Sequence, residues 1–282
     1  MYNESMPELP EVETVVRNLR EPLIGHTVTG MWYDWDRTIH SPDPREFANR
    51  IVGQRFRAIN RRAKYILCEL DDDVLVVHLK MTGRLYVAER SANHDADRWV
   101  HFRLDLDDDY QLRFSDSRKF GRVYLTSDIK TITGKLGPEP LTDDFTAAVF
   151  QAQISGRSKN VKALLLDQTV IAGVGNIYAD EALFRAGIHP LRRSDSLTDE
   201  EVIRLHGTVK DALQAGVDYE GASINWYRKP DGSKGSSQDH FFAYGRDGQP
   251  CKRCGTMIEK IRVAQRGTHF CPNCQLHFEH HD

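Results

Sequence analysis

The sequence predicts an α+β protein, with a β-sandwich domain in its N-terminal part, a helical domain in its C-terminal part and a four-cysteine hairpin at the end. Three observations predict this fold class. Short apolar runs separated by turn residues fill positions 27–126, apolar residues at helical spacing follow after position 142, and two close pairs of cysteines lie between positions 251 and 274. A chain of 282 residues is long enough for two such cores.

The composition indicates a globular protein of the cytoplasm. No run approaches the roughly 18 apolar residues of a membrane span, and the first residues lack the basic and then apolar pattern of a secretory signal. Five cysteines, four of them in one cluster, do not suggest a disulfide framework. Cys68 stands alone in an apolar stretch and is expected in the core.

The net charge of −3 does not by itself indicate a nucleic-acid partner, because phosphate binding is typical of basic domains or stripes. The distribution of charge is more informative, since several basic residues gather between positions 55 and 64. They are Arg55, Arg57, Arg61, Arg62 and Lys64. Such a stretch is either one basic face of the fold or ordinary solvated surface, and composition leaves both interpretations open.

An N-terminal helix is expected after the first prolines. Pro7 and Pro10 suit a first helical turn, where the missing N–H of proline is not needed, and Gly25 marks a stop. The apolar residues at helical spacing between them are Val12, Val15, Val16 and Leu19.

Seven short strands are expected next. Their close spacing favours an antiparallel sandwich or barrel over strand–helix–strand units. The predicted strands cover Arg55–Ile59, Tyr65–Leu70, Val74–Leu79, Arg84–Val87, Val100–Leu106, Gln111–Phe114 and Arg122–Leu125.

The second half is expected to be helical. Gly134–Pro140 contains two glycines and two prolines and marks a linker. Gly221–Ser237 is rich in glycine, serine, lysine and aspartate, and is expected to be a long mobile loop of the kind that often carries function. The predicted helices cover Asp143–Ile154, Asn160–Leu166, Asn176–Ala186 and Thr198–Ala215, the last with a capping box from Thr198 to Glu201.

The four clustered cysteines predict a metal site. Cys251, Cys254, Cys271 and Cys274 form two Cys-x2-Cys pairs separated by sixteen residues, a spacing typical of two turns that offer four thiolates to one tetrahedral Zn²⁺. Four thiolates leave no open coordination position, so the expected role of the metal is structural. An iron centre of the rubredoxin type uses the same ligands and is the alternative.

Between the cysteine pairs the sequence predicts a hairpin with Arg266 at its tip. Several basic residues surround it, namely Lys252, Arg253, Lys260 and Arg262. A basic hairpin suits contact with a phosphate backbone. Zinc hairpins also serve as protein-binding modules or as braces, and the local sequence leaves these interpretations open.

The dipeptide of Met6 and Pro7 has a chemical consequence. In a chain that starts at Met6 and loses it, Pro7 carries a free secondary amine, and an α-amino group with a pKa near ~8 is a nucleophile at neutral pH. We therefore expect residues 1–6 to be an extension or a misassigned start. If residues 1–5 stay attached, Pro7 is an amide without a free lone pair, and the prolines serve only the helix start.

Several separated motifs together resemble bacterial formamidopyrimidine-DNA glycosylase, of the wider family that includes endonuclease VIII. They occur in family order from Met6 to Cys274. The matching stretches are Met6–Glu13, Arg61–Tyr65, His78–Gly83, Asp116–Gly121, Leu136–Leu141, Gly173–Tyr178, Tyr244–Arg246 and the four-cysteine hairpin with Gln265 and Arg266.

The resemblance implies a β-sandwich domain, a helical domain with a helix-two-turn-helix motif and a zinc finger hairpin, with DNA in the cleft between the domains. The expected boundaries are 7–133 for the catalytic sandwich, 134–141 for the linker, 142–240 for the helical domain, 241–275 for the zinc finger and 276–282 for a disordered tail that contains His277, His280 and His281. The implied cofactor is one structural Zn²⁺. The implied partner of a monomeric enzyme is double-stranded DNA that contains oxidised bases or abasic sites.

The resemblance also implies excision of oxidised purines, namely 8-oxoguanine and formamidopyrimidines, followed by strand cleavage. Pro7 matches the nucleophile at the sugar C1′, Glu8 the acid that assists ring opening, and Glu11 a second carboxylate that positions water. Lys64 and Arg266 match residues that contact phosphates and assist β- and δ-elimination. From its local sequence alone, Lys64 would be an ordinary lysine at a strand edge.

A base reached by such an enzyme must leave the stack, and side chains fill the hole that remains. Met81, Arg118 and Phe120 match these void-filling residues, with Arg118 on the orphaned cytosine, although a methionine or phenylalanine on a strand usually belongs to a core. The other residues implied to contact DNA are Asn176 at a helix start, Lys159, Tyr244, Trp99, which stands where the family often has a histidine, and His101 two residues later.

Two alternatives stay open. An endonuclease VIII-like enzyme would act on oxidised pyrimidines, but Leu9 in place of glycine and the long Gly221–Ser237 loop argue against it. A lesion-binding protein without turnover is the alternative if Pro7 is not the mature N-terminus. Borohydride reduction onto abasic DNA separates a binding protein from an enzyme.

Overall fold

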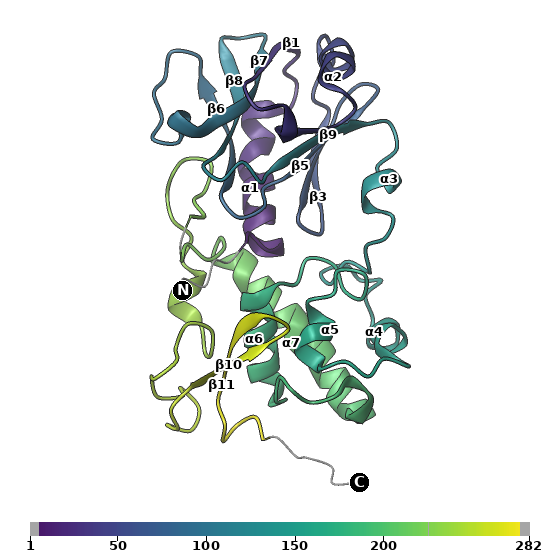
Figure 1. Cartoon of the computed structure of the whole chain (residues 1–282), viewed down its shortest axis with the longest axis vertical. Helices are drawn as coiled ribbons and strands as arrows, with labels where there is room; N and C mark the ends of the chain where they lie inside the picture. Colours follow the sequence, from purple (N-terminus) through teal and green to yellow (C-terminus); the bar gives the residue numbers. More distant parts are fainter. Residues whose placement is uncertain (1–5, 225, 277–282) are drawn as a thin grey trace. The chain divides into compact units, whose positions relative to one another are not determined.

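The computed structural model of the protein describes residues 6–224 and 226–276. Packing divides these residues into two compact units, which are drawn in Figure 1. The β unit comprises residues 6–135 and 220–235, and the helical unit comprises residues 136–219 and 236–276. The predictions for residues 1–5 and for the tail after residue 276 lie outside the described residues.

The β unit begins with helix α1 (Leu9–Leu23), as predicted. Glu8 caps it through a reciprocal capping box with Glu11, and Pro10 occupies the first turn, where its missing N–H is not needed. The helix buries an apolar stripe that contacts β3, β4 and β6, strands of two different sheets. In Figure 1, α1 runs between these sheets.

Two sheets form the sandwich, and all seven predicted strands are present. The four-stranded sheet has the order β1 (Val28–Tyr33), β7 (Val100–Leu106), β8 (Tyr110–Asp116) and β6 (Gly83–Glu89). The five-stranded sheet has the order β2 (Ile39–Ser41), β9 (Arg122–Thr126), β5 (Val74–His78), β4 (Tyr65–Glu69) and β3 (Ala58–Arg62). The prediction of a purely antiparallel fold is wrong at one edge, because β2 pairs with β9 in parallel.

The sequence analysis missed four elements of the β unit: β1, β2, helix α2 (Pro44–Ile51) and the short helix α3 (Lys130–Thr133). β1 has no clear alternation of buried and exposed positions, and β2 is only three residues long. Asp43 caps α2 by accepting the N–H groups of Arg45 and Glu46. β2 has three residues and α2 has eight, too few to show a clear period.

One hydrophobic core joins both sheets, α1 and α2. It includes Val12, Phe47, Val77 and Phe102, all fully buried, and also Tyr227 from the Glu220–Gly235 segment. That segment therefore packs as part of the β unit. The sequence analysis expected this segment in the helical domain at 142–240. It packs in the β unit because the buried Tyr227 ring holds it there.

The helical unit is built around α6 (Asn176–Ala186), which contacts α5 (Val161–Leu165), α7 (Asp199–Asp218) and the strand β11 (Arg266–Phe270). The predicted capping box of Thr198 and Glu201 starts α7. Helix α4 (Ala147–Ile154) starts four residues later than predicted, because Thr146 caps it. A short helix, α3 (Lys130–Thr133), ends the first stretch of the β unit.

The C-terminal hairpin pairs β10 (Glu259–Val263) with β11 in antiparallel register. A small core beneath it contains Phe184, Ala243, Ile258 and two of the cysteines. None of the helices within residues 6–224 and 226–276 is both long and apolar enough to cross a membrane.

Candidate functional site

The start of α1 holds two of the predicted catalytic residues. Pro7 is buried and the Glu8 side chain is only 2 % exposed. The Glu8 N–H donates to Glu11 Oε2 at 2.8 Å, and the Glu8 carboxylate accepts the Glu11 N–H in return.

Glu11 ties the helix to the Glu220–Gly235 segment. Its second oxygen, Oε1, accepts the N–H of Ala222 at 2.8 Å. Gly221 permits this approach, since it has a φ of +81° and an added Cβ would lie 3.0 Å from Glu11 Cγ. Glu11 therefore positions Glu8 and the loop, and its role in holding water stays a prediction.

Lys64 lies in the two-residue turn between β3 and β4, next to Ala63, which has a φ of 53°. A lysine in a tight turn normally extends into water, yet Lys64 is only 6 % exposed. Burial restricts the motion of the Lys64 side chain, and a group that takes part in a reaction requires such a fixed position. Its role in elimination stays a prediction.

His78 is a nearby residue that the sequence analysis did not single out, although it lies within one of the quoted motifs. Its ring is 7 % exposed, and Nδ1 accepts the N–H of Lys80 at 3.0 Å. Burial, together with the charges of Lys80 and Lys64, lowers the pKa of His78 to about 3. The imidazole is therefore neutral, with Nε2 as its donor.

Buried Asp116 joins the two loops that carry the predicted void-filling residues. One carboxylate oxygen accepts from the Thr82 hydroxyl and from the Arg118 N–H, and the other accepts the Gly121 N–H at 2.6 Å. Met81 precedes Thr82, so the structure brings its loop to that of Arg118. Sequence analysis missed Asp116 as a positioning residue because one of its partners, Thr82, lies far away in the sequence.

Arg118 and Phe120 contact each other on one loop. The guanidinium carbon of Arg118 lies 4.9 Å from the Phe120 ring centroid, and Phe120 is 45 % exposed. An exposed phenylalanine beside a cation contradicts the interpretation of Phe120 as core. An exposed aromatic ring is suited to stacking on a flat partner.

Trp99 and His101 differ in their surroundings. Trp99 is partly exposed, with Arg98 stacked 3.7 Å above its ring and Trp226 edge-to-face at 6.3 Å. His101 is buried, and its Nδ1 lies 2.7 Å from Asp34. The other ring nitrogen, Nε2, has no hydrogen-bond partner among the described residues, and the DNA contact of His101 stays a prediction.

In the helical unit, Asn176 lies beside the hairpin that carries Arg266. Asn176 begins α6 and donates from Nδ2 to the carbonyl of Gly267 at 3.0 Å. Arg266 is exposed and follows a turn in which Ala264 and Gln265 both have positive φ. Two such residues in the left-handed region mark a strained turn of the kind that often carries function.

A fully buried ion pair anchors this hairpin, and the sequence analysis missed it. Lys162 Nζ lies 2.6 Å from Asp180 Oδ1 and donates to Thr268 Oγ1 at 2.7 Å. Asp180 Oδ2 accepts the N–H of His269 at 2.9 Å. No local pattern indicates this ion pair, because each of its residues lies in an otherwise ordinary helical or strand pattern.

Lys159 and Tyr244 are the remaining DNA candidates. Lys159 is exposed and lies 3.2 Å from Asp167. Tyr244 is 4 % exposed, donates its N–H to Glu181, and packs edge-on against His269. Both predicted contacts stay predictions.

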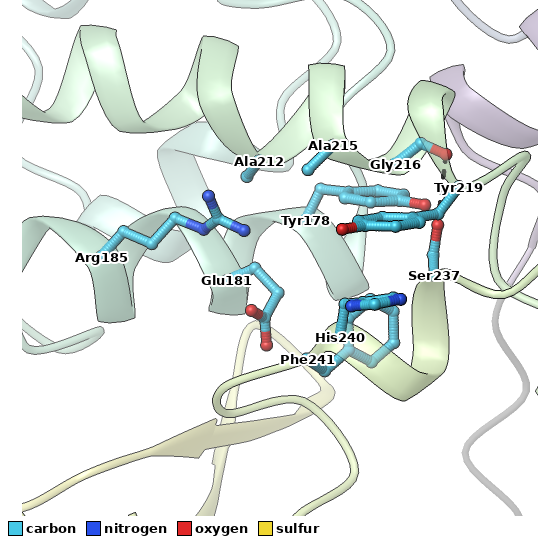
Figure 2. A pocket seen from close by; sticks show the side chains of 10 residues that line it. All are labelled: Tyr178, Glu181, Arg185, Ala212, Ala215, Gly216, Tyr219, Ser237, His240 and Phe241. Carbon is cyan, nitrogen blue, oxygen red and sulfur yellow. Dashed lines mark hydrogen bonds between the residues drawn. The ribbon is translucent and has the colours of Figure 1, made fainter. Parts of the chain in front are cut away.

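Figure 2 shows the side chains that line a small hollow between α6, α7 and the Ser237–Phe241 stretch. Glu181 lies in its wall and accepts the N–H groups of Phe242, Ala243 and Tyr244. Burial raises the pKa of Glu181, while those N–H groups oppose the rise. None of the predicted catalytic residues lines this hollow.

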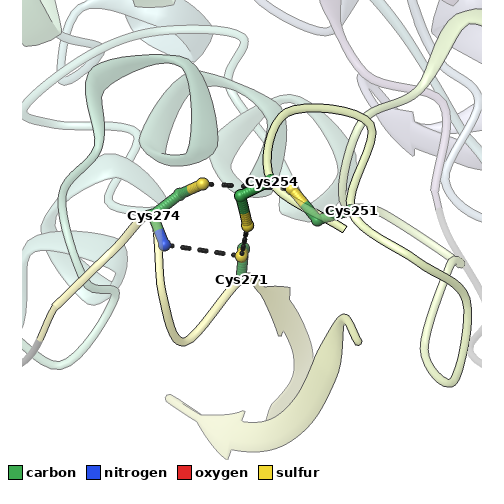
Figure 3. Close-up of side chains that lie close together, drawn as sticks. All are labelled: Cys251, Cys254, Cys271 and Cys274. Carbon is green, nitrogen blue, oxygen red and sulfur yellow. Dashed lines mark hydrogen bonds between the residues drawn. The ribbon is translucent and has the colours of Figure 1, made fainter. Parts of the chain in front are cut away.

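The four cysteines converge as predicted (Figure 3). Their sulfur atoms all lie within 4.8 Å of one another, with 3.9 Å between Cys251 and Cys274 and 3.5 Å between Cys254 and Cys271. A tetrahedral Zn²⁺ with Zn–S bonds of about 2.3 Å requires S–S edges of about 3.8 Å. The residues present therefore fit one structural Zn²⁺.

Comparisons with known proteins identify the family of the chain. Three family models match the chain: "Formamidopyrimidine-DNA glycosylase N-terminal domain" at residues 6–123, "Formamidopyrimidine-DNA glycosylase H2TH domain" at 136–228 and "Zinc finger found in FPG and IleRS" at 248–276.

Curated relatives are similar over nearly the whole chain. The formamidopyrimidine-DNA glycosylase of Chloroflexus aggregans is 49 % identical, over 96 % of this chain and 99 % of that protein. That of Geobacillus kaustophilus is 44 % identical, over 96 % and 100 %.

Solved structures are similar as well. Lactococcus lactis Fpg in complex with abasic-site DNA has a TM-score of 0.88 and 36 % identity, and covers 96 % of this chain and all of that one. Its complex with DNA containing Fapy-dG has the same TM-score and identity. By sequence, fold and metal site, this chain belongs to the formamidopyrimidine-DNA glycosylase family.

Proposed function

We propose that this protein is a DNA glycosylase and abasic-site lyase that removes 8-oxoguanine and formamidopyrimidines from duplex DNA. The observation that carries the proposal is the buried pair of Pro7 and Glu8 at the start of α1, with Glu8 held by a capping box. The relatives named for this activity and the solved complexes with damaged DNA support it.

The first step is displacement of the damaged base. The amine of N-terminal Pro7 forms a bond to the sugar C1′, the glycosidic bond breaks, and its electrons leave with the base. The C1′–O4′ bond of the sugar then breaks, Glu8 gives its proton to O4′, and the proton that the Pro7 nitrogen loses goes to the departing base. The product is an iminium cation between Pro7 and the opened sugar.

The iminium acidifies the C2′–H, which permits two eliminations. Removal of a C2′ proton expels the 3′ phosphate, and a second elimination expels the 5′ phosphate. We assign buried Lys64 to phosphate contact and the first elimination, and Arg266 to the second. Water then releases the sugar fragment and restores the Pro7 amine.

Recognition needs the damaged base outside the stack. Met81 and Phe120 would fill the space it leaves, and Arg118 would bond the orphaned cytosine. The shared tie to Asp116 keeps these loops together. Asn176 and Arg266, joined through Gly267 at one hairpin, would contact phosphate.

The four cysteines hold one Zn²⁺ that shapes the hairpin and supplies no reacting group. We further propose a monomeric protein of the cytoplasm whose partner is double-stranded DNA.

Three measurements test the function. Intact mass of the protein made from its gene should show Pro7 as the first residue. Borohydride should then trap the protein on abasic DNA. Duplexes with 8-oxoguanine should be cut faster than those with an oxidised pyrimidine.

Each outcome has a distinct meaning. Faster cutting of oxidised pyrimidines would favour the endonuclease VIII-like alternative. A protein that retains residues 1–5, binds lesions and is never trapped would be a lesion-binding protein, and the enzymatic proposal would fail.

A further inference from the structure

Trp226 is an exposed tryptophan on the Glu220–Gly235 segment of the β unit. Its side chain is 51 % exposed, and its ring meets that of Trp99 edge-to-face at 6.3 Å. Neither tryptophan belongs to the core of the β unit, and neither takes part in the chemistry proposed above. Their contact therefore joins two surface segments that are more than a hundred residues apart in the sequence, and its purpose is not to build the core.

The Glu220–Gly235 segment is anchored on both sides of the stretch that leads to Trp226. Before it, the Ala222 N–H donates to Glu11 Oε1 at 2.8 Å, and after it the Tyr227 ring is buried in the core. Between these anchors Ile224 and Trp226 are both exposed. The contact with Trp99 therefore gives this stretch a hold on the β unit that the two anchors do not supply.

Trp99 stands on a rigid support. It ends the short 3-10 helix Asp97–Trp99, which leads directly into β7. The Asp97 carboxylate accepts from the Tyr86 hydroxyl at 2.6 Å and from Arg113 Nη1 at 2.9 Å, and these two partners belong to β6 and β8. Because the short helix is tied to two strands of the four-stranded sheet, Trp99 is the fixed partner of the pair.

The Trp99 ring already has two protein neighbours. The guanidinium carbon of Arg98 lies 3.7 Å from the ring centroid, and the Trp226 ring stands at 89° to the Trp99 ring. Stacked cations and edge-to-face rings are both favourable partners of an indole. Since these neighbours share the ring, Trp99 is better suited to act through Trp226 than to contact DNA directly.

The stretch held by Trp99 lies near the proposed reacting groups. Glu11 bonds Ala222 with one carboxylate oxygen and the Glu8 N–H with the other. The four residues from Ala222 to Trp226 span at most about 14 Å of backbone, so Trp226 stays within that reach of the start of α1. A damaged base that is still attached to the sugar reacting at Pro7 enters the same neighbourhood.

We propose that Trp99 is a positioning residue for base excision, which holds Trp226 and the residues beside it where they meet the damaged base. The inference rests on the proposed function. Excision depends on precise placement of the base, and a wall that is fixed before binding supplies this placement. An abasic site has no base to place, so the contact of Trp99 with Trp226 matters for release of the base and not for strand cleavage at an abasic site.

Hydrogen exchange of the full-length protein without DNA tests the contact itself. W99A should speed exchange in the Glu220–Gly235 segment by about two- to tenfold, the range that one aromatic pair supplies. β7 and β8 should exchange as in wild type, which shows that the fold around Trp99 is intact. W32A is the matched control, because Trp32 on β1 also has an arginine over its ring, at 4.8 Å, and it should leave the segment unchanged.

Single-turnover rates on two duplexes test the positioning role. W99A and W226A should each slow release of 8-oxoguanine by about two- to tenfold and leave strand cleavage at a preformed abasic site at the wild-type rate. W99F, which keeps a ring against Trp226, should restore part of the loss. The double variant should be no slower than the slower single variant, because both single changes remove the same contact.

Three results would overturn the inference. If W99A slows both duplexes equally, Trp99 contacts DNA or supports the fold and does not act through Trp226. If the losses of the two single variants multiply in the double variant, the residues act independently. If W99A matches wild type in exchange and in base release, the contact has no role. A wild-type protein that releases no base would instead refute the proposed function, and the exchange comparison would still decide whether Trp99 holds the segment.

Discussion

Residues at the start of α1 serve the helix and the proposed chemistry together. Glu8 caps α1, and the same capping bonds fix the carboxylate beside Pro7. Stability measurements on Glu8 variants therefore cannot separate its capping role from its proposed catalytic role. Variants that keep the cap and remove the acid are the informative ones.

Glu8→Gln should abolish base excision but keep the fold. Glutamine still accepts the Glu11 N–H but gives no carboxyl proton, so excision of 8-oxoguanine should fall by about 10²-fold or more. Borohydride trapping on preformed abasic DNA should persist, since the Pro7 amine remains. Glu21→Gln, on the exposed side of the same helix, is the matched control.

His78 should make stability depend on pH. Its pKa is about 3 in the folded protein and about 6.5 in an unfolded chain, so between these values the unfolded state binds an extra proton. The free energy of unfolding is therefore highest above pH 6.5 and falls as pH drops toward 3, by up to about 1.4 kcal/mol per pH unit from this residue.

His78→Gln should flatten that part of the profile, which urea unfolding at pH 4.5 to 7 would measure. His40→Gln, at an exposed histidine, should leave the slope unchanged. An unchanged slope in His78→Gln would mean that the buried imidazole is not neutral.

Among the elements, the two loops that carry Met81, Arg118 and Phe120 depend on one buried carboxylate. Asp116→Asn should loosen both, because an amide offers one acceptor oxygen where three donors now bond to two. We expect a loss of about 1–3 kcal/mol in unfolding free energy.

The same variant should lose preference for cytosine opposite the lesion, since Arg118 is no longer held. Competition between duplexes with cytosine and adenine opposite 8-oxoguanine would measure this preference. Asp108→Asn, in an exposed turn, is the control. If Asp116→Asn retains the preference for cytosine, Asp116 has no part in recognition of the opposite base.

The hairpin of β10 and β11 depends on the Lys162 and Asp180 pair. Asp180→Asn should leave Lys162 charged in a fully buried position, at a cost of about 3–5 kcal/mol. Hydrogen exchange should rise in β11 and α6 and stay unchanged in β4 and β5 of the other unit. Strand cleavage should fall with it, since Arg266 begins β11.

At the scale of the whole molecule, the chain returns to its first unit after building most of the second. The Glu220–Gly235 segment gives Tyr227 to the core of the β unit. Burial, with the charges of Glu11 and Glu220, raises the pKa of the Tyr227 phenol. The stability of the β unit therefore depends on residues far outside its continuous stretch.

Tyr227→Ala tests this dependence. Loss of a buried aromatic ring should cost about 3–5 kcal/mol, and hydrogen exchange should rise in α1 and the strands around it rather than in α6 and α7. Tyr219→Ala, at a more exposed tyrosine of the helical unit, should not produce that pattern. If hydrogen exchange rises in α7 alone, the Glu220–Gly235 segment does not pack in the core of the β unit.

The sequence by itself determined the fold class, seven of the nine sandwich strands, the main helices and the zinc ligands. These follow from local information: a hydrophobic period, a capping box, or four thiolates at short spacing.

Only the tertiary structure decided what depends on distant partners. The burial of Lys64 and His78, the tie of Asp116, the Lys162–Asp180 pair and the packing of Glu220–Gly235 all join residues far apart in the chain. Burial and pairing arise from contacts across the fold, so no local pattern encodes them.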